Sequence, residues 1–69
     1  MKQLMAALII DDERLARNAL KKKLEAFPEI EIVGEASNVR NAIAAIEEHN
    51  PDLLFLDIQL YNEHFLKLK

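Results

Sequence analysis

The sequence predicts an α/β fold in which a parallel three-stranded sheet carries a helix on each face. Two apolar runs support this prediction: Ala6 to Ile10, and Leu53 to Leu56, which leads into Asp57. Unbroken apolar runs of this length are typical of strands that are buried on both faces of a parallel sheet. The segments between the two runs show helical spacing of apolar residues, so the two strands can run in the same direction.

The first half of the chain predicts a strand, a helix and a second strand. Asp12 is expected to cap a helix from about Glu13 to Ala26, which Phe27-Pro28 ends because a residue before proline is disfavoured in the helical region. Glu29 to Gly34 alternates acidic and apolar residues, which indicates a strand at the sheet edge with one face in solvent. The apolar residues that predict the helix are Leu15, Ala16, Ala19, Leu20 and Leu24.

The second half predicts a helix and the third strand. Ser37 or Asn38 is expected to cap a helix from about Val39 to His49, and Asn50-Pro51 ends it. Right-handed crossovers then place the first strand at the centre, give the strand order two, one, three, and put the helices on opposite faces. Phe27 and Phe55 are expected in the core, and the stripe expected to face the sheet is Val39, Ala42, Ile43 and Ile46.

The segment after the third strand allows two conformations. Most residues from His64 to Lys69 are adequate helix formers, which favours a helix. Apolar and basic residues also alternate there, so the segment could instead form a strand that returns along the third strand after a turn at residues 61–64. We prefer the helix, and the hairpin remains the alternative.

Composition limits the possible functions. A chain of 69 residues forms at most one domain and buries only ~60% of its unfolded surface. The absence of cysteine gives no indication of disulfides or of an oxidising compartment, so a cytoplasmic location is expected. The net charge of -3 argues against a nucleic-acid-binding surface, which would normally carry a basic patch. The basic run Lys21 to Lys23 falls late in a predicted helix, where cations suit the helix dipole, so a solvated helix face explains it better. The first ten residues fit neither a signal peptide nor a membrane span.

Carboxylates follow both apolar runs. The carboxyl ends of adjacent parallel strands lie ~4.8 Å apart, so Asp57 is expected near Asp11 and Asp12. Three carboxylates at one point repel each other unless a cation joins them, and oxygen ligands suit Mg²⁺. A carboxylate beside Mg²⁺ is also a possible nucleophile for a phosphoryl group. The alternative is structural: two acids cap a helix and one ends a strand. Spacing alone leaves both interpretations open.

The motifs Leu8-Ile9-Ile10-Asp11-Asp12-Glu13 and Leu53-Leu54-Phe55-Leu56-Asp57, with Val33-Gly34-Glu35-Ala36 between them, resemble the receiver domain of two-component response regulators. The resemblance covers residues 7–60 and is strongest to receivers that precede LytTR-type DNA-binding domains. It implies a flavodoxin-like fold and a phosphorelay role rather than an enzyme. It also implies that Asp57 is the phosphoacceptor, that Asp11 and Asp12 hold Mg²⁺, and that Gln59 supplies a main-chain carbonyl ligand.

Departures from the family accompany this resemblance. Receivers continue with two more strands that bear a Thr or Ser and then a Lys, and the family usually has a glycine soon after the position of Leu60; residues 61–69 diverge from this pattern. We therefore expect residues 1–69 to be a single partial domain, the N-terminal half of a receiver, with poor phosphoacceptor activity.

Two other functions remain possible at this point. One is an active phosphoacceptor that catalyses its own phosphorylation from a phosphodonor; the resemblance implies a histidine kinase as its partner. The other is a self-associating half-domain with a structural role and no signalling activity. A homodimer is expected, through the third strand and residues 61–69, because an apolar edge strand recruits a partner strand. The alternative is a monomer in which residues 61–69 fold back as a fourth, antiparallel strand and cover that edge.

Overall fold

The structure is a computed structural model that describes residues 3–57. Its elements are β1 (Met5–Ile10), α1 (Arg14–Leu24), β2 (Ile30–Ala36), α2 (Val39–His49) and β3 (Leu53–Leu56). Within this part of the chain, no helix has the length and apolar character needed to cross a membrane. The predictions for Gln59 and for residues 61–69 lie outside the described residues.

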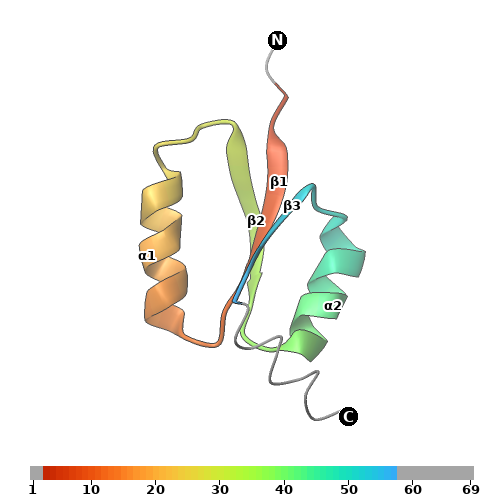
Figure 1. Ribbon diagram of the computed structural model, residues 1–69. Helices are drawn as coiled ribbons and strands as arrows, with labels where there is room; N and C mark the ends of the chain where they lie inside the picture. Colours follow the sequence, from red (N-terminus) through yellow and green to blue (C-terminus); the bar gives the residue numbers. More distant parts are fainter. Residues whose placement is uncertain (1–2, 58–69) are drawn as a thin grey trace.

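The three strands form one parallel sheet in the order β2-β1-β3. Figure 1 shows α1 and α2 on opposite sides of this sheet. Right-handed crossovers produce this arrangement when the first strand is central. The predicted α/β class, strand order and helix placement are therefore confirmed. This arrangement is the first half of a flavodoxin-like fold.

The central strand β1 forms the core of the fold. Its residues from Ala7 to Ile10 are at most 2% exposed, because β2 and β3 pair with its two edges and a helix lies over each face. Near the carboxyl end, Ile10 packs with Ala36 of β2 and Ala42 of α2. The apolar run in the sequence identified this strand correctly.

The outer strand β3 is less buried than its sequence predicts. Leu54 is 46% exposed, so the prediction of burial on both faces is wrong for β3 among the described residues. The reason is position: β3 lies beside β1 at the end of the described sheet, whereas α2 packs mainly over β2 and β1. Phe27 is 50% exposed and is not a core residue, because it lies in the turn after α1 rather than over the sheet.

Both ends of helix α1 differ from those predicted. The predicted cap at Asp12 is wrong: the N-cap residue is Glu13, whose side chain makes no capping bond, and the Glu13 amide donates to Asp11 Oδ1 at 2.9 Å. The helix ends at Leu24, two residues before the predicted end, in a tight turn where the Phe27 amide donates to the Leu24 carbonyl. Leu24 is buried, but Leu15 is 77% exposed and Ala19 is also exposed, so only part of the predicted apolar stripe meets the sheet.

Helix α2 agrees with its prediction at both ends. Asn38 is the N-cap residue and its side-chain oxygen accepts from the Asn41 amide at 2.7 Å. At the other end Asn50 adopts the left-handed conformation, with a φ of 46°, which stops the helix before Pro51. Ala42 is buried on the sheet, whereas Ile43 is exposed.

Strand β2 contains an irregularity that matters for the site. The register with β1 shifts between Ala7 and Leu8, which pair with Ile32 and Gly34 and leave Val33 as an extra residue. The strand then continues to Ala36, two residues past the predicted end. This extension carries Glu35 to the carboxyl edge of the sheet, beside the residues that follow β1.

Candidate functional site

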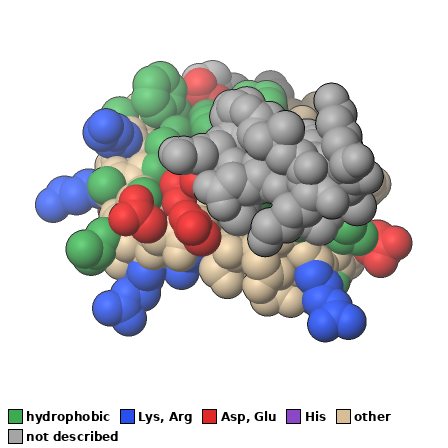
Figure 2. Space-filling view, turned by 60° about the horizontal axis from the view of Figure 1, so that its bottom comes forward, with side chains coloured by type: hydrophobic (Ala, Val, Ile, Leu, Met, Phe, Trp, Pro, Cys, Tyr) green, Lys and Arg blue, Asp and Glu red, His purple; other side chains and the backbone are tan. Residues whose placement is uncertain are grey.

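Three carboxylates meet at the carboxyl edge of the sheet. Asp11 and Asp12 follow β1 and Asp57 follows β3, and one oxygen of each lies within 4.8 Å of the others. Main-chain hydrogen bonds hold the two strand ends: the Asp11 amide donates to the Ala36 carbonyl at 3.0 Å, and the Asp57 amide donates to the Ile10 carbonyl at 2.9 Å. Figure 2, in which this end of the molecule comes forward, shows acidic side chains grouped there.

The donor set fits a hard divalent cation. Asp11 and Asp57 are half-buried and Asp12 is exposed, so a cation could reach the cluster from solvent. Two oxygens bound to one Mg²⁺ at ~2.1 Å lie at most ~4.2 Å apart, which is close to the 4.8 Å limit of this cluster. Carboxylates alone, without His or Cys, favour Mg²⁺ over softer metals. These residues could therefore hold Mg²⁺ after small side-chain rotations.

A hollow borders the carboxylates on the face of the sheet that carries α1. Its volume is about 230 Å³, and it gives a small molecule room beside the ends of β1 and β3. Its lining residues are Ile9, Ile10, Asp11, Leu20, Phe55, Leu56 and Asp57.

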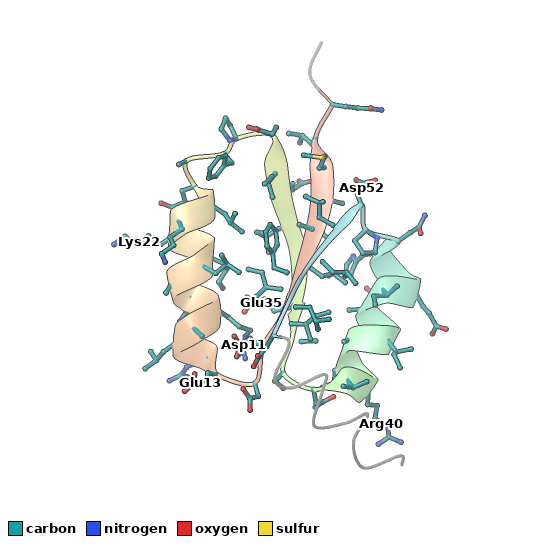
Figure 3. All side chains as sticks on the ribbon, viewed as in Figure 1. Asp11, Glu13, Lys22, Glu35, Arg40 and Asp52 are labelled. Carbon is teal, nitrogen blue, oxygen red and sulfur yellow. The ribbon has the colours of Figure 1, made fainter. Side chains whose placement is uncertain are left out.

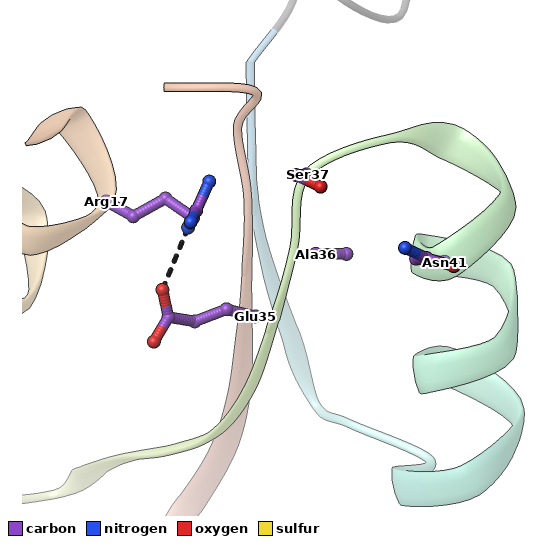
Figure 4. Close-up of a pocket in the computed structure, with 5 residues that line it drawn as sticks. All are labelled: Arg17, Glu35, Ala36, Ser37 and Asn41. Carbon is purple, nitrogen blue, oxygen red and sulfur yellow. Dashed lines mark hydrogen bonds and ion pairs between the residues drawn. The ribbon is translucent and has the colours of Figure 1, made fainter. Parts of the chain in front are cut away.

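A charged network beside the cluster was not predicted from the sequence. Arg17 Nε donates to Glu35 Oε1 at 2.9 Å, and Lys21 Nζ donates to Glu35 Oε2 at 2.6 Å. Arg17 Nη1 also donates to the main-chain carbonyl of Asp11 at 2.7 Å. Figure 4 shows the Arg17 side chain reaching from α1 to Glu35 on β2, and Figure 3 shows Asp11 and Glu35 at the same end of the sheet.

This network affects the ionisation of Glu35. The hydrogen bond from Lys21, followed by that from Arg17, lowers the pKa of the Glu35 carboxyl below its ordinary value of about 4.5, although partial burial opposes the shift. A sequence signal for the network existed: Arg17 and Lys21 are four residues apart on one helix, and therefore on one face. Their partner could not be inferred, because Glu35 reaches this edge only through the extension of β2.

The model of the response regulator receiver domain matches residues 7–67. The chain belongs to this receiver family. The resemblance predicted from the motifs around Asp11 and Asp57 is therefore confirmed, and so is the flavodoxin-like class of the sheet.

Individual relatives agree with this membership. The receiver is 44% identical over 61 residues to the sensory transduction protein LytT of Bacillus anthracis, which covers 88% of the chain and 25% of the relative. It is 49% identical over 57 residues to the transcriptional regulatory protein BtsR of Escherichia coli, covering 83% and 24%. An uncharacterized response regulatory protein of Vibrio cholerae is 48% identical over 61 residues, covering 87% and 23%. The chain thus spans about a quarter of the length of the curated relatives it matches.

Proposed function

We propose that Asp57 is the phosphoacceptor of this receiver and that the acidic cluster binds Mg²⁺. The observation that carries the proposal is the meeting of Asp11, Asp12 and Asp57 within 4.8 Å at the end of the sheet, in a chain that belongs to the receiver family. Asp11, Asp12 and Asp57 would hold the ion together with the main-chain carbonyl of Gln59, which lies outside the described residues. When bound, Mg²⁺ offsets negative charge on the phosphoryl oxygens.

The residues of the chain itself perform the transfer. An Asp57 carboxylate oxygen forms a bond to phosphorus while the bond from phosphorus to the donor breaks, and the departing group keeps the electron pair and takes a proton from water. With a phosphorylated histidine kinase as donor, the departing group is an imidazole nitrogen. Asp11 and Asp12 keep the ion beside Asp57. In this proposal the chain is the acceptor of the group rather than an enzyme, it works in the cytoplasm, and its net charge of -3 disfavours a role in nucleic-acid binding.

The transfer is expected to be slow for the 69-residue chain alone. Phosphoryl transfer depends mainly on positioning and on cations that offset the developing charge. Arg17 and Lys21 are cations near this edge, but both are paired with Glu35. The resemblance implies that a Thr or Ser and a Lys on later strands would contact the phosphoryl group, and the described residues contain no strand after β3.

Acetyl phosphate tests the proposed acceptor. The 69-residue chain is incubated with acetyl phosphate and Mg²⁺, and the added phosphoryl mass is followed by intact-protein mass spectrometry. We expect slow, incomplete labelling that requires Mg²⁺ and disappears in Asp57→Asn. Labelling that persists in Asp57→Asn would disprove the acceptor role, and rapid stoichiometric labelling would disprove the slow rate.

A second candidate function is self-association, and the surface around β3 favours it. Leu54 is 46% exposed and lines an apolar hollow between β3 and α2. Exposed apolar strand edges recruit a second strand, and small domains without disulfides gain stability by oligomerising. We therefore propose a twofold homodimer that meets through β3, with residues 61–69 included in the interface. The hollow is lined by Ile10, Val39, Ala42, Ile43, Ile46, Leu54 and Leu56.

Light scattering tests the homodimer over a wide range of protein concentrations. We expect the mass of two chains at high concentration and a shift to one chain in Leu54→Glu, which places a charge on the proposed interface. Leu15→Glu is the matched control, because Leu15 is exposed on α1 and lies far from β3 along the chain. A single-chain mass at every concentration would rule out the homodimer.

A further inference from the structure

Arg17 connects three parts of the fold that meet at the acidic cluster. Its side chain starts from the first turns of α1, and its main-chain amide donates to the Glu13 carbonyl at 3.1 Å. Its guanidinium reaches Glu35 at the end of β2 and the main-chain carbonyl of Asp11 at the end of β1. One planar group thus fixes the ends of two strands and the start of a helix relative to each other.

Asp11 is held at three of its atoms. Its amide donates to the Ala36 carbonyl, its carbonyl accepts from Arg17 Nη1, and its Oδ1 accepts from the Glu13 amide. Of these three bonds, the one from Arg17 is donated by a side chain and accepted by the main chain. It therefore acts on the peptide group that joins Asp11 to Asp12, two of the three carboxylate residues of the cluster.

The Arg17 side chain is also held firmly. It is only 15% exposed, and Glu35 accepts from it while accepting from Lys21 with its other oxygen. A guanidinium presents several donors in a rigid plane, so one Arg can serve a carboxylate and a carbonyl together. A Lys at this position would have a single nitrogen and could not reproduce both bonds in the same geometry.

We propose that Arg17 is a positioning residue for the acidic cluster: by holding the Asp11 carbonyl, it orients Asp11 and Asp12 toward Asp57 for cation binding. Glu35 holds the guanidinium in place. This inference rests on the proposed function, since it assigns Arg17 a part in the Mg²⁺ site. It adds a residue that never contacts the ion.

Electrostatics and positioning predict opposite effects of removing Arg17. A cation beside the cluster repels Mg²⁺, so loss of the charge alone would strengthen Mg²⁺ binding. Loss of positioning would weaken it, and residues that orient metal ligands typically contribute roughly 10- to 100-fold to metal affinity. The sign of the change therefore separates the two roles.

The experiment measures Mg²⁺ affinity from the amide shifts of Asp12, Glu13 and Asp57 during titration. We expect about 10-fold weaker binding in Arg17→Met and in Arg17→Lys. Lys21→Met is the matched control: it removes a cation from Glu35 but leaves the bond to Asp11, so its affinity should stay within about twofold of the unmodified chain or rise slightly. Unchanged or tighter binding in both Arg17 variants would overturn the inference.

A second readout needs no metal. The Glu13 amide, which donates to Asp11 Oδ1, should exchange its hydrogen faster in both Arg17 variants and at the unmodified rate in Lys21→Met. If the unmodified chain shows no response to Mg²⁺, the proposed metal site fails, and the exchange rate still decides whether Arg17 positions Asp11. An unchanged Glu13 exchange rate in the Arg17 variants would refute that positioning.

Discussion

Replacing Gly34 by alanine should destabilise the fold, although alanine suits a strand better than glycine does. A Cβ atom at this position would lie 3.0 Å from Leu8 Cδ2 and 3.4 Å from the ring of His49. The His49 ring is partly exposed and can move aside, but Leu8 is completely buried and cannot. The glycine is therefore required by close packing between β2, β1 and α2.

The expected magnitude follows from two opposing effects. Overpacking of a filled core costs ~1 to 3 kcal/mol. Restriction of the unfolded chain by alanine returns about 0.4 to 1 kcal/mol. We expect a net loss of about 0.5 to 2 kcal/mol, a measurable part of the roughly 3 to 10 kcal/mol typical of a chain of this length.

Urea unfolding followed by circular dichroism measures this loss. With a slope of about 1 kcal/mol per molar urea, the midpoint of Gly34→Ala should fall by about 0.5 to 2 M. In a Leu8→Val background, which removes the Cδ2 atom, the cost of the alanine should shrink by about 0.5 kcal/mol or more. Equal or greater stability of Gly34→Ala in the unmodified background would refute the packing argument.

Two further predictions concern Glu35 and the N-cap of α2. Because the pKa of Glu35 is lower in the folded than in the unfolded chain, the unfolded state takes up the proton first as pH falls; the stability that Glu35 supplies is present above about pH 4.5 and lost below it. Glu35→Gln should therefore lower the urea midpoint at pH 7 and differ less from the unmodified chain at pH 3, whereas Glu31→Gln on the same strand should change little; equal effects at both pH values would contradict this. Asn38→Ala removes the cap of α2 and should cost ~1 kcal/mol in urea unfolding, and Asn38→Asp should retain most of the stability; an unchanged midpoint in Asn38→Ala would show that the cap is not formed.

Sequence patterns best predicted the elements that neighbouring residues encode and the strand that is buried on both faces. Helix α2 was predicted over Val39 to His49 because its cap and its stop are both encoded by neighbouring residues. Strand β1 was predicted because burial on both faces requires an unbroken apolar run. The meeting of Asp11, Asp12 and Asp57 followed from the parallel order of the strands.

The features that sequence patterns missed depend on contacts between distant segments. The apolar run from Leu53 to Leu56 predicted that Leu54 is buried, yet its exposure depends on which elements lie beside β3. Asp12 was expected to cap α1, but the helix begins one residue later, with Glu13 as its N-cap residue, and Asp11 Oδ1 accepts from the Glu13 amide. The Arg17 bond to Glu35 depends on the extension of β2 to Ala36, which nothing in the local pattern after Gly34 indicates.

The acids at the end of the sheet are proposed to form one Mg²⁺ site, and a titration of the 69-residue chain with Mg²⁺ examines that site without any other reactant. We predict saturable shifts of the Asp12, Glu13 and Asp57 amides at millimolar Mg²⁺, abolished in Asp11→Asn. Glu31→Gln, which removes the same charge from an exposed position on β2, should titrate as the unmodified chain does. An absence of shifts at the cluster, or an Asp11→Asn response equal to that of the unmodified chain, would contradict the claim.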